Sequence, residues 1–324
     1  MSKDRCIGID LLRGIAAFGI IGCHLSLSPR TVGGDLVTAL CDFNVGVFAA
    51  VAGFLMYGGK LESDWLAYVK KRAKRLLPTY MLWSVVFVLA IAVFDLLFDG
   101  GQLNPRYRTV GFWERVVLTG GSSPHLWFLV CLFYVQVLLR PFLKVGNAKW
   151  NGVVWIMLGG FMIAASVASD NWFGLYPLRL LAFLMTGYGL GCCYHAGLLD
   201  FYVKRSQVAW CVAAGILAAH VMARRIAPGF IRDWIAVGPV LVAFLGIAFN
   251  GARMARAAEV LGATSMGVYL IHPLITRGLS VIVARCTHSP YSAQVVVCDW
   301  ILSWVFAFIA ALVLRRVPIV KRFT

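Results

Sequence analysis

The sequence predicts an all-α polytopic membrane protein with about ten transmembrane helices. Hydrophobic residues make up 60% of its 324 residues, charged residues make up only 14%, and the mean hydropathy is +0.81. Apolar runs of spanning length recur from end to end, whereas the alternating pattern of a transmembrane barrel is absent. We therefore expect one integral membrane domain over residues 1–324, without an appended soluble domain, in the inner (plasma) membrane.

The predicted spans follow from the apolar runs taken in order. They cover residues 7–26, 35–58, 78–98, 124–145, 151–168, 176–196, 206–223, 234–250, 260–284 and 293–314. The fifth, seventh and eighth are close to the minimum length of a helix that crosses the hydrocarbon core. Between the third and fourth spans, residues 111–118 (GFWERVVL) predict a short interfacial helix.

Positive charge orients these spans. An even number of spans places both termini on one side, and the connections on that side hold more than twice as many Lys and Arg residues as the opposite ones. The positive-inside rule therefore places both termini in the cytoplasm. The same bias accounts for the net charge of +16, and no motif that combines aromatic and basic residues indicates nucleic acid. The expected surroundings are membrane lipids.

Polar residues interrupt the first span, GIDLLRGIAAFGIIGCH (residues 8–24). A charge in hydrocarbon costs about 2.5–3.5 kcal/mol, so such residues usually line an enclosed cavity or take part in chemistry. Arg13 and His24 are eleven residues apart and fall on one helix face, about 16 Å apart along the axis. Asp10 is placed to pair with Arg13. The small residues between Arg13 and His24 allow another helix or a slim ligand to lie close.

His24 is the candidate catalytic group of this helix. In the predicted orientation His24 lies in the outer half of the span and Arg13 in the inner half. Histidine is the usual general base, and an apolar setting favours the neutral form that a base needs to deprotonate a hydroxyl group. The alternative is an ion pair between Asp10 and Arg13 near the membrane surface, together with a buried structural histidine.

The most basic connection carries a second candidate site. Residues 61–77 (LESDWLAYVKKRAKRLL) alternate apolar and basic residues, which predicts an amphipathic cytoplasmic helix between the second and third spans that ends at Pro78. Arg72 and Arg75 are three residues apart on one face, and two guanidinium groups side by side suit a phosphate. The alternative is contact with anionic lipid head groups, or a plain topology signal.

Two further stretches contribute candidate cavity-lining or substrate-binding residues. His125 and Trp127 open the fourth span on the predicted outer side, where an interfacial tryptophan is normal. In TSMGVYLIHPL (264–274), Ser265, Tyr269 and His272 share one helix face, and the proline that follows can free backbone carbonyls. The alternative for this second group is a polar seam between two helices.

The sequence predicts no metal site. Its nine cysteines lie mostly within apolar runs, where they are typical small packing residues. Neither a CxxC pair nor a mixed spacing of Cys and His indicates a metal ion.

Four of these stretches together resemble the acyltransferase-3 family, whose members are integral membrane acyltransferases that modify bacterial surface carbohydrates and related acceptors. The stretches are GIDLLRGIAAFGIIGCH, with ten residues between Arg13 and His24, RAKR (72–75) before LLPTY, HLWFL (125–129) and SMGVYLIHPL (265–274). The second span, NVGVFAAVAGFLMYGG, resembles the family's segment rich in Gly and Phe less closely. The resemblance covers residues 7 to about 316.

The resemblance implies an O-acetyltransferase that uses acetyl-coenzyme A as co-substrate and modifies an envelope glycan or a lipid-linked sugar. It implies that Arg72 and Arg75 hold the phosphates of the donor on the cytoplasmic face. It also implies that His24 acts at the acceptor hydroxyl and that Arg13 lines the passage between the two. Larger relatives carry a hydrolase-like domain after the tenth span, and this chain ends at Thr324, which leaves the acceptor open.

Alternatives stay open on the sequence alone. A transporter or flippase for an acyl group or lipid-linked sugar would also line a pathway with polar residues, but the related halves common in transporters are absent. A structural partner of an envelope-polymer synthase is another class. Within the enzyme hypothesis, a covalent acyl-enzyme relay competes with direct transfer, because Cys23 adjoins His24. The acyl chain length and the oligomeric state are not predicted.

Overall fold

The computed structural model is almost entirely helical. It describes residues 6–24, 41–58, 64–98, 109–118, 123, 125–143, 148–168, 176–223, 229–247, 251–286 and 293–317. Of these residues 92% are helical and none is in a strand. The predicted all-α class is therefore confirmed over the described chain. Both termini, and residues 35–40 of the second predicted span, lie outside the described residues.

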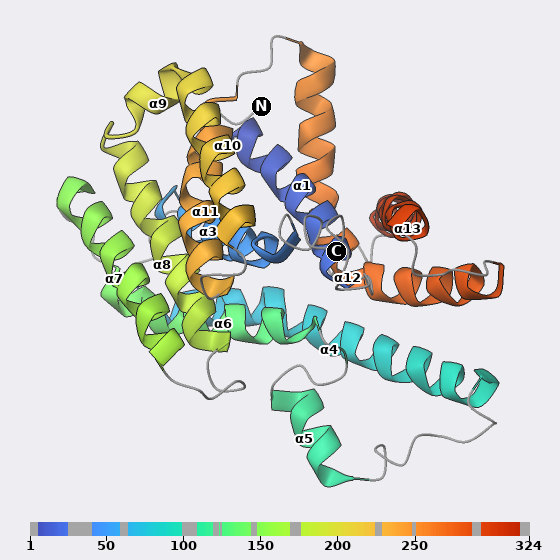
Figure 1. Ribbon diagram of the computed structural model, residues 1–324. Helices are drawn as coiled ribbons and strands as arrows, with labels where there is room; N and C mark the ends of the chain where they lie inside the picture. The colour runs from blue at the N-terminus through green and yellow to red at the C-terminus, as the bar shows by residue number, and fades with distance from the viewer. Residues whose placement is uncertain are drawn as a thin grey trace. The chain divides into compact units, whose positions relative to one another are not determined.

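The helices divide between two compact units (Figure 1). The first unit comprises residues 1–61 and 144–309, and the second comprises residues 62–143 and 310–324. The first unit contains α1 (Ile7–Cys23), α3 (Asn44–Gly58), α7 (Ala148–Ala168), α8 (Tyr176–His195), α9 (Asp200–Lys204), α10 (Ser206–Met222), α11 (Gly229–Leu245), α12 (Ala252–Cys286) and most of α13 (Ala293–Leu314). The second contains α4 (Trp65–Phe98), α5 (Val110–Leu118), α6 (Trp127–Leu139) and the 3₁₀ turn η2 (Arg140–Phe142).

Each of the ten predicted spans falls on one of these helices. Three stretches, Trp65–Leu97, Ala252–Val283 and Val295–Leu314, are long and apolar enough to cross a membrane by length and composition. Shorter apolar helices cover Asn44–Tyr57, Trp127–Phe142, Trp150–Ser166 and Ser206–Met222. Residues 111–118 are helical in α5, as predicted. The number of membrane crossings and the orientation of the termini stay predictions.

Close contact between α1 and α12 positions the polar residues of the first unit. A Cβ atom added to Gly262 would lie 2.6 Å from Cα of Asp10, and one added to Gly14 would lie 2.7 Å from Cβ of Leu261. Small residues thus bring the two helices closer than larger side chains would permit. Of the two uses that the small residues of α1 allow, a neighbouring helix or a slim ligand, the structure shows the neighbouring helix at Gly14.

Helix α13 is attached to α1 by an aromatic contact. The rings of Phe18 and Trp300 stack with their centres 4.5 Å apart, and Trp300 Nε1 donates to the Phe18 carbonyl at 2.8 Å. Trp304 adds an edge contact to the Phe18 ring at 5.7 Å. Helix α1 therefore has partners from both α12 and α13.

The predicted helix end at Pro78 is wrong. Helix α4 continues from Trp65 to Phe98 with Pro78 inside it, so the amphipathic stretch and the third predicted span form one helix. A proline in a helix removes one backbone donor, and nearby Ser or Thr hydroxyl groups can compensate for the weakened bonds. The carbonyl without a helical donor is that of Lys74, and Thr79 Oγ1 donates to the next carbonyl, that of Arg75, at 3.0 Å.

Candidate functional site

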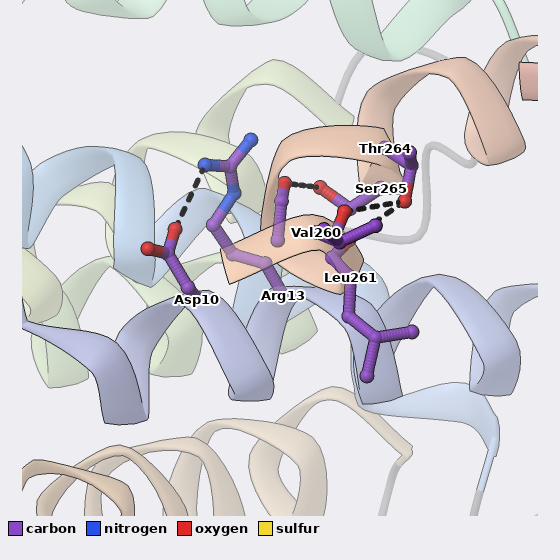
Figure 2. A network of polar contacts seen from close by, with 7 residues as sticks. Asp10, Arg13, Val260, Leu261, Thr264 and Ser265 are labelled. Atoms are coloured by element: carbon purple, nitrogen blue, oxygen red, sulfur yellow. Dashed lines mark hydrogen bonds and ion pairs between the residues drawn. The ribbon is translucent and has the colours of Figure 1, made fainter. Parts of the chain in front are cut away.

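The ion pair predicted in the first span forms in α1. Arg13 Nη1 lies 3.8 Å from Asp10 Oδ1, and the side chains are 24% and 10% exposed respectively. Figure 2 shows the pair beside the turn of α12 that carries Thr264 and Ser265. Both hydroxyl groups of that turn bond within their own helix: Ser265 Oγ donates to the Gly262 carbonyl at 2.8 Å, and Thr264 Oγ1 donates to carbonyls one turn back.

At the other end of α1, His24 meets a histidine of α12. The ring centres of His24 and His272 are 5.1 Å apart. His24 is exposed, whereas His272 is fully buried. The tertiary fold therefore brings together two imidazoles that lie 248 positions apart in the sequence. One candidate residue from each of two predicted motifs contributes to this contact.

The proline after His272 determines how that imidazole is held. Pro273 has no backbone N–H, so the carbonyl of Tyr269, four residues earlier, lacks its usual helical donor. His272 Nδ1 lies 2.7 Å from that carbonyl oxygen. A carbonyl oxygen can only accept, so Nδ1 must carry a proton. In the neutral imidazole the basic lone pair is then on Nε2.

Tyr269 completes this face of α12. Its side chain is 3% exposed, and its ring centre lies 6.0 Å from that of His272 and 6.1 Å from that of Phe48 in α3. Ser265, Tyr269 and His272 are all buried, as a shared helix face predicts. Their predicted role as cavity-lining residues stays a prediction.

A second polar cluster near the end of α1 was not singled out from the sequence. His220 Nε2 lies 3.8 Å from Asp233 Oδ1, and Arg232 Nη1 donates to the His220 carbonyl at 3.2 Å. The thiol of Cys23 lies within electrostatic reach of Asp42 and Asp233. A charged or titratable side chain inside an apolar run is the signal that could have indicated His220, which falls in the predicted span 206–223.

In the second unit, two basic side chains lie over the ring of one tyrosine. Tyr68, Arg72 and Arg75 follow one another at i, i+4 and i+7 on α4, and Arg140 follows α6. Arg72 Cζ lies 5.1 Å and Arg140 Cζ 5.4 Å from the centre of the Tyr68 ring. The Arg75 guanidinium group also lies close enough to that of Arg72 for the two to repel each other. The helical spacing could have indicated Tyr68, but nothing in the sequence pairs Arg140 with it.

Two donors in this cluster have no hydrogen-bond partner in the described chain. They are the hydroxyl group of Tyr68 and Nε of Arg72, and both atoms are buried. A buried donor left without a partner costs about 1–3 kcal/mol. A cluster of cations that also holds unused buried donors is an arrangement suited to an anion.

His125 and Trp127 also belong to the second unit. His125 is 2% exposed, its Nδ1 lies 2.8 Å from Ser123 Oγ, and its ring meets the edge of Phe87 with centres 4.8 Å apart. Trp127 is half-buried and contacts the ring of Phe128. His125 is thus packed against α4, and its predicted position at the level of His24 stays a prediction.

The predicted residues fall into two groups. The first unit holds the candidates on α1 and α12, namely Asp10, Arg13, His24, Ser265, Tyr269 and His272. The second unit holds Arg72, Arg75, His125 and Trp127. Among the described residues, no group of three or more His, Cys, Asp or Glu side chains is arranged to hold a metal ion.

Comparison with known protein families gives a match over nearly the whole chain. A family model described as an acyltransferase domain matches residues 7–315, which include all the candidate residues above. Comparison with curated proteins and with solved structures gives no significant match.

Proposed function

Because the chain belongs to the acyltransferase-3 family and is therefore a membrane acyltransferase, we propose that it is an O-acetyltransferase of the bacterial inner membrane. Its donor is cytoplasmic acetyl-coenzyme A. Its acceptor is a hydroxyl group of an envelope glycan or of a lipid-linked sugar. The observation that carries the proposal is the contact of His24, at the end of α1, with His272 of α12. The Asp10–Arg13 pair lies nearer the other end of α1.

His24 is the general base of the proposed reaction. It takes the proton of the acceptor hydroxyl, and the oxygen attacks the carbonyl carbon of the acetyl thioester. A new C–O ester bond forms, the C–S bond breaks, and the thiolate of coenzyme A leaves and takes up a proton. His24 is the more exposed of the two imidazoles, so an acceptor that arrives from solvent reaches it first.

His272 supports this reaction from the buried side. Its Nδ1 proton is committed to the Tyr269 carbonyl, so its Nε2 is the atom that can exchange a proton with a neighbour. The buried ring packs against that of His24 and limits the orientations of the base. Orienting a base in this way is a recognised part of general-base catalysis.

The donor is held by its phosphates at Arg72 and Arg75. Neither guanidinium group forms an ion pair with a carboxylate of the described residues, so both can bind a phosphate. The pantetheine arm cannot lie along α1 at Gly14, because α12 occupies that surface. No step of the proposed acetyl transfer requires a metal ion.

Acetyl transfer by the purified protein tests the proposal. Radiolabelled acetyl-coenzyme A is incubated with candidate glycan acceptors, and the acceptor is analysed for label. We expect His24→Ala to reduce transfer by about 10²–10⁴-fold, the range of general-base catalysis, without loss of folding. The matched control is His195→Ala, which removes the last histidine of α8, whose ring stacks on that of Tyr57 in α3. Full activity of His24→Ala would show that His24 is not the base.

A further inference from the structure

A buried hydroxyl group close to His272 has no hydrogen-bond partner within the described protein. We propose that Thr276 of α12 is a further catalytic residue, whose hydroxyl group donates a hydrogen bond to the carbonyl oxygen of the acyl thioester as that oxygen becomes negatively charged. Resting on the proposed function, this assignment adds to His24 and His272 a side chain that the sequence motifs do not include.

Threonine hydroxyl groups inside helices normally bond the helix itself, by donating to a carbonyl three or four residues earlier. In the described chain Thr79, Thr186 and Thr264 all donate to the carbonyl four residues earlier, at 3.0, 2.9 and 2.8 Å. Figure 2 shows the bonds of Thr264. Thr276 is the fourth threonine within a described helix, and its Oγ1 has no hydrogen-bond partner in the described chain.

The Thr276 side chain is also shielded from water. The residue is 6% exposed, and its Oγ1 is buried. Nearly all buried polar groups in native proteins have a hydrogen-bond partner, which is either a protein group, an ordered water or a ligand. Since the described chain supplies no partner, an oxygen atom of a ligand is the expected one.

The position of Thr276 on α12 relates its hydroxyl group to the two imidazoles. Thr276 follows His272 by four residues, which is about one helical turn, so the two side chains share a helix face. A helical side chain covers the turn that precedes its own Cα, and for Thr276 that turn carries His272. The ring of His272 in turn lies 5.1 Å from that of His24. One site therefore takes His24 from α1 and two side chains from α12.

The next hydroxyl group along this face differs from that of Thr276. Ser280, a further turn along α12, donates to Asp299 Oδ2 of α13 at 3.0 Å. The other carboxylate oxygen of Asp299 accepts from Ser303 at 3.2 Å. Of the two hydroxyl groups that follow His272 at intervals of one turn, only that of Thr276 is left for a ligand in the described chain.

The proposed reaction creates a partner for this hydroxyl group. As the oxygen of the acyl acceptor attacks the thioester, a C–O bond forms and one electron pair of the C=O bond moves onto the carbonyl oxygen. Thr276 donates a hydrogen bond to this oxyanion and keeps its own proton. The electron pair returns when the C–S bond breaks, and the thiolate of coenzyme A leaves and takes up a proton. A fixed donor in a site without water stabilises such a developing charge more strongly than water does.

Exposure assigns different roles to His24 and Thr276. His24 is exposed and is the group that an acyl acceptor reaches from solvent, whereas Thr276 is buried. The attacked carbonyl group therefore has its base on the open side and its hydroxyl donor on the buried side. Rotation about one side-chain bond moves the threonine hydroxyl between its two helical rotamers, so it can turn toward the carbonyl oxygen.

A non-transferable donor analogue tests the contact itself. The carba(dethia) analogue of acetyl-coenzyme A, in which a methylene group replaces the thioester sulfur, is isotope-labelled at the carbonyl carbon and bound to the full-length protein in phosphatidylcholine nanodiscs. Isotope-edited infrared spectroscopy gives the carbonyl stretching frequency, which a hydrogen bond lowers. We expect a lower frequency in the wild type and in Thr276→Ser than in Thr276→Val. Equal frequencies in the wild type and Thr276→Val would overturn the assignment.

Acetyl transfer and thermal unfolding of the same variants test the role in the reaction. Thr276→Val is expected to lower kcat about 10²–10³-fold, the usual effect of removing one oxyanion donor, with no change in KM for acetyl-coenzyme A. Its thermal midpoint should equal or exceed that of the wild type, because a buried hydroxyl without a partner is removed. Thr276→Ser should retain most of kcat. Thr264→Val is the matched control on the same helix and should keep the kcat of the wild type, because that hydroxyl bonds its own backbone.

Other roles of Thr276 give different results. An unchanged kcat with a lower thermal midpoint in Thr276→Val would assign the hydroxyl group to a bound water and overturn the catalytic role. A higher KM for the acyl acceptor with an unchanged kcat would assign it to binding of that substrate and also overturn the catalytic role. A carbonyl frequency that depends on Thr276 without any acetyl transfer would support the contact and contradict the proposed function. Transfer that proceeds unchanged in Thr276→Val would do the reverse.

Discussion

At the scale of single residues, Pro273 has two opposite effects. Proline in a helix interior costs about 3 kcal/mol of helix stability relative to alanine. Here it also frees the carbonyl that accepts Nδ1 of His272. The residue next to the proposed base is therefore oriented by a local defect in the helix, which is the kind of trade between stability and activity found at functional sites.

Pro273→Ala tests whether this defect has a role. The alanine N–H is expected to bond the Tyr269 carbonyl and compete with His272, so the thermal midpoint should rise while kcat falls about tenfold. KM for the donor should not change, because the donor phosphates are bound elsewhere. Pro239→Ala in α11 is the control. It also replaces a proline inside a helix, but it is not next to the candidate site, so it should raise the thermal midpoint and leave kcat unchanged. An unchanged kcat in Pro273→Ala would leave the proline with a structural role only.

At the scale of helices, the fold depends on how closely α1 approaches α12. A Cβ added at Gly262 would lie 2.6 Å from Cα, Cβ and Oδ1 of Asp10, so any larger residue must push the helices apart. Backbone atoms of both helices define the contact and cannot simply rotate away. The separation of α1 from α12 also determines whether His24 and His272 can meet, so packing and the candidate site are coupled.

Gly262→Ala is expected to lower stability by about 1–3 kcal/mol, the usual cost of overpacking, and to reduce acetyl transfer. Gly278→Ala is the matched control on the same helix, because nothing lies within 4 Å of a Cβ added there. Better helix propensity should make that variant neutral or slightly more stable. Thermal unfolding of the two proteins side by side gives the comparison. Equal stability of the two variants would mean that the α1–α12 contact yields more easily than its geometry indicates.

At the scale of the whole molecule, charge predicts which side each segment faces. Lys70 of α4 and Gly111 of α5 are both exposed and belong to connections on opposite predicted sides of the membrane. Single cysteines introduced there test the orientation against the background labelling of the parent protein. Lys70→Cys should react only with a membrane-permeant maleimide, whereas Gly111→Cys should react with an impermeant one added to intact cells. Labelling of Lys70→Cys from outside would reverse the predicted orientation.

Local patterns predicted much of the fold, and long-range contacts account for most of what was missed. The ten helical runs follow from apolar length, and the cost of charge in hydrocarbon indicated Arg13 and His24. Helix α4 continues through Pro78, which a general rule about proline as a helix terminator does not anticipate. The contact of Tyr68 with Arg140 is a tertiary contact between residues far apart in the sequence, so local periodicity could not predict it.

The attachment of α1 to α12 and α13 has a consequence for the order of assembly. Helix α1 is the first of these to be synthesised, yet the partners that cover it, including Trp300, are made some 240 to 280 residues later. At about 5–20 residues per second, this interval is on the order of tens of seconds. During that time the Asp10–Arg13 helix must be retained in the membrane without α12 and α13, with α3 as the neighbour that is made soonest after it. The polar face that α1 turns toward α12 is therefore covered by its final partner only when translation is nearly complete.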